Sequence, residues 1–423
     1  MMVHPEIKPM ELNDLALPLT RVMPNAVQLH VLKGDTSGTV RLELLFKGGY
    51  AVQDKPLQAT FTNRMLREGA GEWNADEISQ KLDYYGAWIE TYSSQGCNHV
   101  TLYALSKHFP ELLGLLAVMV KSPTFPQNSL DVIRRNAKGY YAVNSKKVDV
   151  VAQRYFENSL WGDSHPLGHV VELEDYDSLT RDDLLKYYAL VYGSRNCSVF
   201  ISGSVDDALL DAVEKHFGQD EWGCDAGIGE VSVAPPDTVF GRCNVEVSDT
   251  MQCGVKIGFM AMDSASPDLY KFRFLTVLLG GYFGSRLMSN IREENGYTYH
   301  ISAEIDAYGK RNAFMISSET ANEYVESCIK EIYAEIEKLV SEPVPAEEVE
   351  HVRNYIFGEM CREFEGLTPR SEAFVNAWLS GDEFRSVNDY LETVRAVTPE
   401  ELLFVARKYF DRKKMIEIVA GTV

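Results

Sequence analysis

The spacing of apolar residues switches repeatedly along the chain between the period of a strand and the period of a helix. Alternation over residues 40–46 predicts a half-buried strand, and a spacing of three to four residues over 57–69 predicts a helix. Residues 88–94 and 98–105 alternate again and predict a hairpin, whereas 128–160 predict one long helix or two consecutive helices. This pattern favours an α+β protein with a mostly antiparallel sheet over a parallel βαβ series.

Several helix ends carry recognisable signals. Asn74 is a candidate N-cap for a helix that continues to Tyr85, and Gly86 follows as the residue that ends it. Thr180 is a candidate N-cap for a second helix, which we expect to end near Tyr192. Both helices precede strands in the predicted order.

The chain repeats itself internally. Segments in the two halves match at nearly one offset, 218 residues for the first two pairs and 215 for the third: 179–185 with 397–403, 198–205 with 416–423, and 40–42 with 255–257. Chance is a poor explanation for three matches at nearly one offset, so we expect two copies of one α/β unit.

The junction between the copies is expected in a stretch rich in Gly, Asp and Pro. The predicted organisation is an N-terminal domain over residues 1–216, a linker over 217–237 and a C-terminal domain over 238–423. A chain of 423 residues is long enough for two such domains.

Composition excludes several function classes. The formal net charge of −21 argues against binding to nucleic acid or to an anionic membrane, although solubility alone explains such a charge equally well. The longest apolar run, 112–120, is too short to cross a bilayer, and the N-terminus shows no secretory signal. Seven scattered cysteines without a CxxC pair are most simply reduced thiols in the cytoplasm.

The stretch 278–299 contains the most informative local pattern. It predicts a helix, a glycine turn at Gly280 and Gly281 where positive φ ends the helix, a second short helix and then a strand. Arg292 in the last helical turn and Tyr299 in the strand are expected near one junction, where a guanidinium and a phenol could grip a carbonyl or an oxyanion. Spacing alone favours the simpler interpretation of a surface Arg and a half-buried strand Tyr.

This stretch, GGxxxSRLxxxIREExGYxY, resembles the C-terminal signature of the pitrilysin (insulinase) zinc peptidase family, including its mitochondrial-processing-peptidase-like members. Residues 86–92, 122–126 and 397–402 also look like landmarks of that family. The resemblance runs from about residue 25 to the end of the chain. It implies two homologous α/β-roll halves that are joined by a linker and face each other like a half-clamshell.

Active members of the family carry His-x-x-Glu-His on the first long helix of the N-terminal half, where the two His bind zinc and the Glu is the general base. The resemblance places these positions on Thr60, Asn63 and Arg64, none of which can replace the family residue. The third ligand, a Glu on a later helix, is expected within 134–147, which contains no acidic residue. We therefore expect no zinc site in this chain.

We find no convincing substitute site in the sequence. His165 and His169 are four residues apart, but the Pro and Gly between them make presentation from one helix face improbable. A Gly-x-Ser-x-Gly nucleophile motif and a P-loop are both absent from the sequence, so neither serine hydrolase nor nucleotide chemistry is indicated.

The resemblance also implies which residues of this chain have functional roles. In the family, the matching Arg and Tyr of the C-terminal half act on the scissile carbonyl and its neighbour, which assigns these catalytic roles to Arg292 and Tyr299. A strand beside the zinc helix pairs with extended substrate, which assigns substrate binding to Trp88, Glu90 and Tyr92, although a plain sheet edge would look the same.

Three functions stay open at this point. Some bacterial members divide the work between two chains, so this chain could be the non-catalytic subunit of a heteromeric zinc peptidase. The zinc would then lie in a homologous partner in a heterodimer, with self-association as a homodimer the alternative. A peptide-binding or scaffold protein without a proteolytic role, and a peptidase with an unfamiliar metal site, are the other two.

Overall fold

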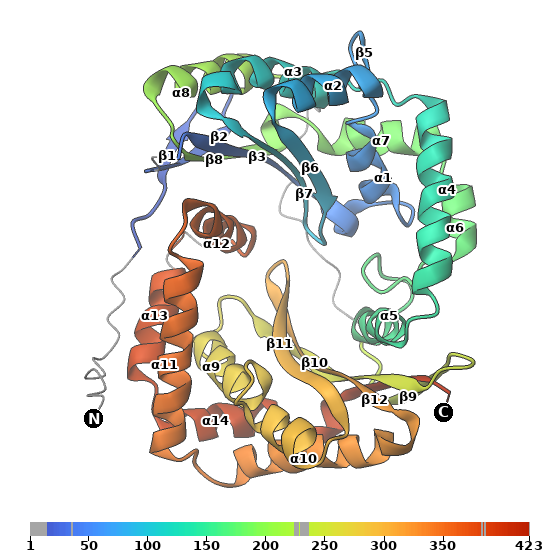
Figure 1. Ribbon diagram of the computed structural model, residues 1–423, viewed down its shortest axis with the longest axis vertical. Coiled ribbons are helices and arrows are strands. Elements are labelled where there is room, and N and C mark those ends of the chain that lie inside the picture. The colour runs from blue at the N-terminus through green and yellow to red at the C-terminus, as the bar shows by residue number, and fades with distance from the viewer. Residues whose placement is uncertain are drawn as a thin grey trace, which may run out of the picture. The chain divides into compact units, whose positions relative to one another are not determined.

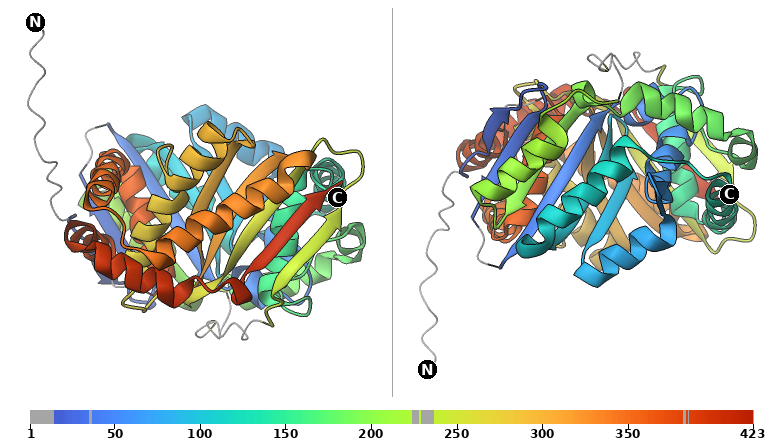
Figure 2. Two further views of the ribbon diagram at one scale, coloured as in Figure 1. Left: turned by 90° about the horizontal axis from the view of Figure 1, so that it is seen from below. Right: turned by 90° about the horizontal axis from the view of Figure 1, so that it is seen from above.

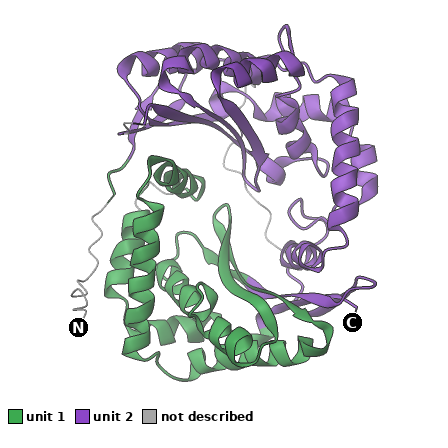
Figure 3. Cartoon of the chain, in the orientation of Figure 1, with its two compact units in different colours: residues 1–17, 260–413 green, residues 18–259, 414–423 purple. Residues whose placement is uncertain are grey.

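The computed structural model describes residues 15–34, 37–223, 228, 237–381, 384 and 386–422 (Figure 1). Contacts divide the chain into two compact units (Figure 3). Unit 1 contains residues 1–17 and 260–413, and unit 2 contains 18–259 and 414–423. The linker predicted at 217–237 falls largely outside the described residues, so that domain boundary stays a prediction.

Unit 2 is built on a six-stranded sheet. Its strand order is β1 (Leu19–Val22), β2 (Gln28–Lys33), β8 (Cys197–Gly203), β3 (Thr39–Lys47), β7 (Cys97–Leu105) and β6 (Trp88–Ser93). Every pair is antiparallel except β2 with β8, which run parallel. The predicted hairpin is therefore β6 and β7, and β6 lies at an edge of the sheet.

Helices cover one face of this sheet, and they include α2 (Ala75–Tyr85), α3 (Phe109–Lys121) and α8 (Asp207–Val213) (Figure 2). Apolar side chains from alternate strand positions, such as Leu42 and Leu102, pack beneath them in a common core. The side chains between them point to the opposite face, which is polar at several positions. The alternation along the strands thus places apolar side chains on the face that the helices cover and polar side chains on the opposite face.

The remaining helices of unit 2 confirm several expectations. They are α1 (Gln58–Met65), α4 (Gln127–Asn144), α5 (Val148–Trp161), α6 (Leu173–Ser178) and α7 (Arg181–Val191). Residues 128–160 thus form two helices. Asn74 and Thr180 are N-caps with complete capping boxes, and Gly86 ends α2 with a φ of 61°. A two-stranded ladder joins β4 (Gly69–Ala70) to β5 (Trp73–Asn74).

The second sheet has the strand order β11 (Thr298–Tyr308), β12 (Arg311–Ala321), β10 (Gln252–Asp263), β13 (Ile416–Gly421) and β9 (Gly241–Glu246). Strand β10 runs through the boundary between the units. The helices of unit 1 are α9 (Leu269–Gly280), α10 (Val325–Ser341), α11 (Ala346–Glu363), α12 (Leu367–Leu379), α13 (Ser386–Ala396) and α14 (Pro399–Tyr409). Within the described ranges, no helix is both long and apolar enough to cross a membrane.

The two sheets repeat one topology, as the matching segments predicted. In chain order, β2, β3, β6, β7 and β8 correspond to β9, β10, β11, β12 and β13, and both sets have the same order across the sheet. The parallel pair is β2 with β8 in one sheet and β9 with β13 in the other. Helices α7 and α14 also match, since each has 11 residues and follows a Thr with a capping box. The α+β fold with a mostly antiparallel sheet is confirmed.

A close backbone contact fixes α5 against the sheet formed by β9, β10 and β13. A Cβ at Gly254 of β10 would lie 2.4 Å from the carbonyl oxygen of Val148, the first residue of α5. Replacing Gly254 by Ala should therefore destabilise the protein by about 1–3 kcal/mol, because one of the two backbones must move. Thermal unfolding followed by calorimetry measures the change.

Gly139 provides the matched control for this prediction. It lies inside α4, and a Cβ there would meet nothing within 4 Å. Gly139→Ala should raise stability by about 0.5–1 kcal/mol, since it lowers the entropy of the unfolded chain and favours helix. Equal effects of the two substitutions would contradict the contact assigned to Gly254.

Candidate functional site

The segment that carries Arg292 and Tyr299 begins where α9 packs closely on β11. A Cβ at Gly280, the last residue of α9, would lie 2.6 Å from the backbone nitrogen of Ala303 in β11. The expectation of a positive φ at this glycine pair is wrong, because Gly281 caps the helix with a φ of −85°. Glycine is required at 280 because the helix and the strand approach closely, and not because of φ.

The second helix of the segment is a short π-helix, Met288–Glu294. Leu287, Met288 and Ile291 are buried, as the predicted apolar face required. The wider turns are visible in the hydrogen bonds that end it, since the Asn295 N–H donates to the Asn290 carbonyl at 3.0 Å. Gly296 then adopts a φ of 68° and leads into β11. Single π-turns are frequent at functional sites because they change the direction of one side chain.

Tyr299 lies in a β-bulge that the sequence pattern did not reveal. The register of β11 with β12 shifts between Thr298, which faces Thr320, and Ile301, which faces Ser318. The buried Thr298 hydroxyl donates to the Glu319 carbonyl at 2.6 Å and accepts from the His300 N–H at 3.2 Å. These bonds hold the extra residue in place, and a bulge of this kind re-aims a side chain.

Both predicted residues keep their donor groups available. The Arg292 guanidinium lies over the Phe283 ring at 4.7 Å and is half-buried. Tyr299 is 88% exposed, and within the described residues neither its hydroxyl nor the Arg292 guanidinium has a hydrogen-bond partner. A phenol and a guanidinium presented this way could donate to a carbonyl oxygen that becomes negative during a reaction.

The three positions that the resemblance assigns to a degenerate zinc motif lie on α1, where Asn63 holds the helix to the hairpin. Its Nδ2 donates to the carbonyl of Tyr92 at 2.6 Å and to the carbonyl of His99 at 3.1 Å. Thr60 lies near the Tyr50 hydroxyl, and Arg64 is exposed. Both Asn63 amide hydrogens are thus committed to backbone, and the residue is part of the fold.

The residues near α1 do not fit a zinc ion. Arg134 of α4, in the region expected to hold the third ligand, is bonded to Asp131 and to the Leu179 carbonyl. His165 is buried against Trp161, and His169 contacts Asp175 at 2.9 Å, so neither histidine is arranged as a ligand. Across the described ranges, no group of three or more His, Cys, Asp or Glu side chains could hold a metal ion.

Strand β6 presents Trp88, Glu90 and Tyr92 on the polar face of the sheet at its edge. Trp88 stacks on Tyr103 with ring centroids 4.8 Å apart, and Tyr92 stacks on His99 at 4.0 Å. Both aromatic residues keep about half of their surface exposed, 52% and 51%, so a ligand could reach both rings. Glu90 is exposed between them.

The edge of β6 is also open for backbone pairing. Ser94 donates its N–H to the Cys97 carbonyl at 2.8 Å, so the alternate residues Ile89, Thr91 and Ser93 direct their backbone groups away from β7. The Tyr50 hydroxyl donates to the outward carbonyl of Ser93 at 2.5 Å. The groups of Ile89 and Thr91 therefore remain for an added strand.

A buried charge network beneath these stacks was missed by sequence reasoning. The Glu43 carboxylate is fully buried and accepts from Arg41 at 2.6 Å and from His99 Nδ1 at 2.8 Å. Arg41 also donates to the Tyr103 hydroxyl at 3.3 Å, so the network holds both rings that support Trp88 and Tyr92. The available signal was a pair of charged residues at alternate positions of an otherwise apolar strand.

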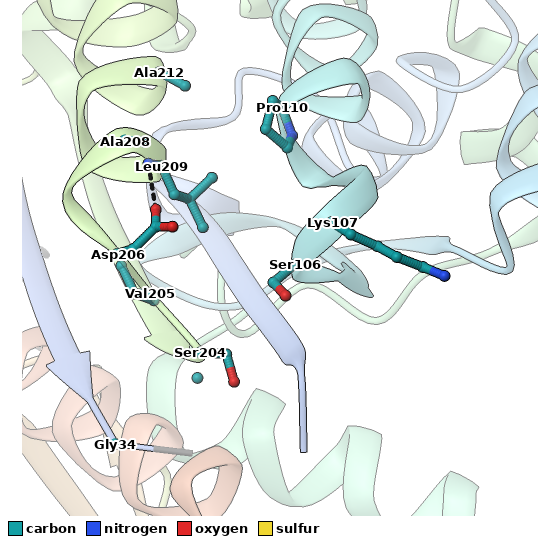
Figure 4. A pocket seen from close by; sticks show the side chains of 11 residues that line it. Gly34, Ser106, Lys107, Pro110, Ser204, Val205, Asp206, Ala208, Leu209 and Ala212 are labelled. Atoms are coloured by element: carbon teal, nitrogen blue, oxygen red, sulfur yellow. Dashed lines mark hydrogen bonds between the residues drawn. The ribbon is translucent and has the colours of Figure 1, made fainter. Parts of the chain in front are cut away.

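A hollow of about 780 Å³ lies elsewhere in unit 2, between α8 and the start of α3 (Figure 4). Its lining includes Lys107, Ser204 and Asp206, and the Asp206 side chain is already committed to capping α8. Because none of the predicted site residues lines it, this hollow does not belong to the candidate site.

Comparison with known proteins finds a matching family model, similar relatives and similar solved structures. Residues 178–356 match the family model described as the peptidase M16 inactive domain. An uncharacterized zinc protease of Rickettsia felis is 22% identical over 384 residues, 88% of this chain and 90% of that protein. A non-peptidase homolog, YmxG, of Helicobacter pylori is 24% identical over 275 residues, 62% of this chain and 60% of that protein.

A solved structure shows the same fold. The crystal structure of a peptidase M16 inactive domain from Pseudomonas fluorescens aligns with a TM-score of 0.86 at 20% identity and covers 96% of this chain and 98% of that chain. At this identity, the likeness supports the fold and carries no statement about activity.

Glu43 gives the site a pH-dependent stability. Burial by itself raises the pKa of Glu43, but the hydrogen bond from His99 and the charge of Arg41 outweigh it, so the pKa is lowered from its ordinary value of 4.5. Glu43→Gln should destabilise the protein by about 3 kcal/mol at neutral pH, because Arg41 loses its buried partner. Urea unfolding between pH 7 and pH 3 measures the effect.

The sign of the pH dependence follows from the lowered pKa. The carboxylate contributes stability above pH 4.5 and loses it as the pH falls through the lower pKa of the folded state, so the gap between variant and wild type should close in acid. Glu90→Gln, an exposed carboxylate on the same face, should change stability by less than about 0.5 kcal/mol. A gap at Glu43 that is constant with pH would contradict the role of its charge.

Proposed function

We propose a function from the premise that this chain belongs to the M16 (pitrilysin) peptidase family, as its motifs predicted and its inactive-domain match bears out. The chain acts as a non-catalytic subunit of a heteromeric zinc metallopeptidase. It contributes Arg292 and Tyr299 to cleavage of peptides or unfolded polypeptide segments. The zinc and the general base come from a homologous partner subunit that carries His-x-x-Glu-His.

The observation that carries this proposal is the presentation of Tyr299. Its phenol is 88% exposed on a bulge that buried Thr298 and Ser318 hold by hydrogen bonds, and it contributes no hydrogen bond to the described fold. Arg292, on the π-helix that precedes β11, is braced by Phe283. Tyr299 would donate to the scissile carbonyl as it becomes an oxyanion, and Arg292 would hold a neighbouring carbonyl.

The state of α1 supports the need for a partner. Asn63 stands at the position of the general base, cannot accept a proton as a carboxylate does, and donates both amide hydrogens to backbone carbonyls. A partner in a heterodimer would supply the missing chemistry. A homodimer would not, since it would duplicate the same residues.

The cysteines support a cytoplasmic location. Cys97, Cys197, Cys243 and Cys328 are free thiols, and burial raises the pKa of several described cysteines, including Cys253 and Cys328. Buried free thiols behave as small apolar residues and persist where the compartment is reducing.

A second candidate function is peptide binding or scaffolding without proteolysis. It is favoured by the open edge of β6, where the stacked rings of Trp88 and Tyr92 flank Glu90 and the backbone groups of Thr91 face outward. An extended peptide could add to this edge with no metal nearby.

The subunit proposal predicts a defined loss for Tyr299→Phe. The chain alone should show no peptidase activity and no stoichiometric zinc. Mixed with a homologous chain that carries His-x-x-Glu-His, it should support peptide cleavage, and Tyr299→Phe should lower kcat by about 100- to 1000-fold because an oxyanion donor is removed. Turnover of a quenched fluorescent peptide by the mixture measures this.

Tyr84→Phe is the matched control for that experiment. Tyr84 lies on α2, is 82% exposed and is not part of the site, so turnover should be unchanged. Undiminished turnover with Tyr299→Phe would contradict its catalytic role. Stoichiometric zinc in the chain alone would contradict the conclusion that Thr60, Asn63 and Arg64 cannot form a zinc site.

The peptide-binding candidate predicts a different loss at β6. Thr91→Pro removes an outward N–H of the edge without breaking the ladder to β7, so binding of an unfolded polypeptide should weaken by about tenfold. Tryptophan fluorescence and anisotropy of a labelled peptide measure this. Thr276→Ser in α9, a buried position outside the sheet of β6, is the control and should bind as wild type does.

A further inference from the structure

Strand β9 forms the other edge of the second sheet, and its backbone groups are positioned for another strand. It pairs in parallel with β13, and the N–H groups of Gly241 and Val247 donate to Met415 and Gly421 of that neighbour at 2.9 and 3.0 Å. By alternation, the even-numbered residues of β9 direct their N–H and C=O groups to the open edge. Figure 1 shows β9 at the rim of its sheet.

The repeat shows what this edge accommodates. The strand equivalent to β9 in the first sheet is β2, which is likewise parallel to its inner neighbour. There the outer edge is covered by β1, which pairs with β2 in antiparallel register over Leu19–Val22. Within the described residues, no strand of this chain takes the corresponding place beside β9.

The side chains of β9 match those of a second β9 in antiparallel orientation. Arg242, Asn244 and Glu246 are all exposed, and they are the residues whose backbone groups face outward. If two β9 strands meet with Asn244 opposite Asn244, Arg242 of each copy lies opposite Glu246 of the other. Opposite charges in directly facing positions stabilise an antiparallel pair.

The residues at the ends of β9 fit the same arrangement. Phe240 just before the strand is 53% exposed. In an antiparallel pair, the start of one strand lies beside the end of the other, so Phe240 of each copy would lie just beyond Glu246 of its partner and could cover the end of the pair. The strand also lacks the Lys or Pro with which proteins usually block an open edge.

We propose that β9 pairs with β9 of a second copy of this chain and forms a two-fold symmetric dimer with a continuous sheet. A symmetric interface requires a self-complementary surface, and the Arg242 and Glu246 arrangement around Asn244 provides one. The strand of an unrelated protein would satisfy the backbone groups but would not match these charges. Strand β9 shares no residue with the proposed catalytic pair, so this inference does not depend on the proposed function.

The first experiment measures the mass of the full chain by light scattering after size exclusion, and the dimer dissociation constant by analytical ultracentrifugation. Glu246→Arg places like charges opposite each other twice and should raise that constant by about tenfold or more. Arg242→Glu combined with Glu246→Arg exchanges the charges and should restore dimerisation. Arg242 also contacts Glu417 at 3.4 Å within its own chain, so a second readout is needed.

That readout is cross-linking at the two-fold axis, which leaves both charges in place. In a Cys243→Ser background, Asn244→Cys should form a disulfide between two chains under oxidising conditions, since facing residues in such pairs have Cα atoms about 5.5 Å apart. Glu246→Cys is the control, because it faces Arg242 and should not cross-link. A monomer at every concentration, or a dimer that neither responds to Glu246→Arg nor cross-links through Asn244→Cys, would overturn the proposal.

Discussion

The hydrogen-bonding demand of open strand edges organises this molecule. Both sheets share one strand order, and that order leaves β6 at one edge of the first sheet and β11 and β9 at the edges of the second. A strand edge presents unpaired N–H and C=O groups that must find water, a side chain or another strand. The candidate functional features lie at these edges: the aromatic row on β6, Tyr299 on β11 and the self-complementary face of β9.

The two copies of the repeat treat their equivalent edge strands differently. In the first copy, β6 has a rigid support. The buried Glu43 carboxylate fixes Arg41 and His99, and these two residues hold or supply the rings on which the aromatic side chains of β6 stack. In the second copy, β11 is deformed by a bulge that Thr298 and Ser318 maintain. A flat, supported edge suits an extended chain, whereas a bulged edge suits the presentation of one side chain.

Sequence reasoning predicted the local structure well where local interactions decide it. The capping boxes at Asn74 and Thr180, the end of α2 at Gly86 and the β6–β7 hairpin all depend on residues a few positions apart. The bulge and the Glu43 network could not be predicted, because they depend on contacts between distant segments. Thr298 with Ser318, and Glu43 with His99, are separated by 20 and 56 residues.

The error at Gly280 and Gly281 has the same origin. A glycine near a helix end usually indicates a positive φ, and the sequence alone does not reveal a strand that approaches the helix from outside. The contact with Ala303 is such an approach. A glycine can therefore be identified correctly as essential to a turn while the physical reason for it lies in a segment more than twenty positions away.

Asn63 and Tyr299 differ in a way that bears on function. The fold uses both amide hydrogens of Asn63, which join α1 to two strands, and these bonds account for an amide at this position. Tyr299 contributes no hydrogen bond to the described residues and buries little surface, so the stability of the fold gives no reason for a phenol there. Buried hydroxyls nevertheless hold the bulge that presents it. A backbone arranged around a side chain that the fold does not use is what a ligand-binding role for Tyr299 would require, and in the proposed function the zinc and the general base come from another chain.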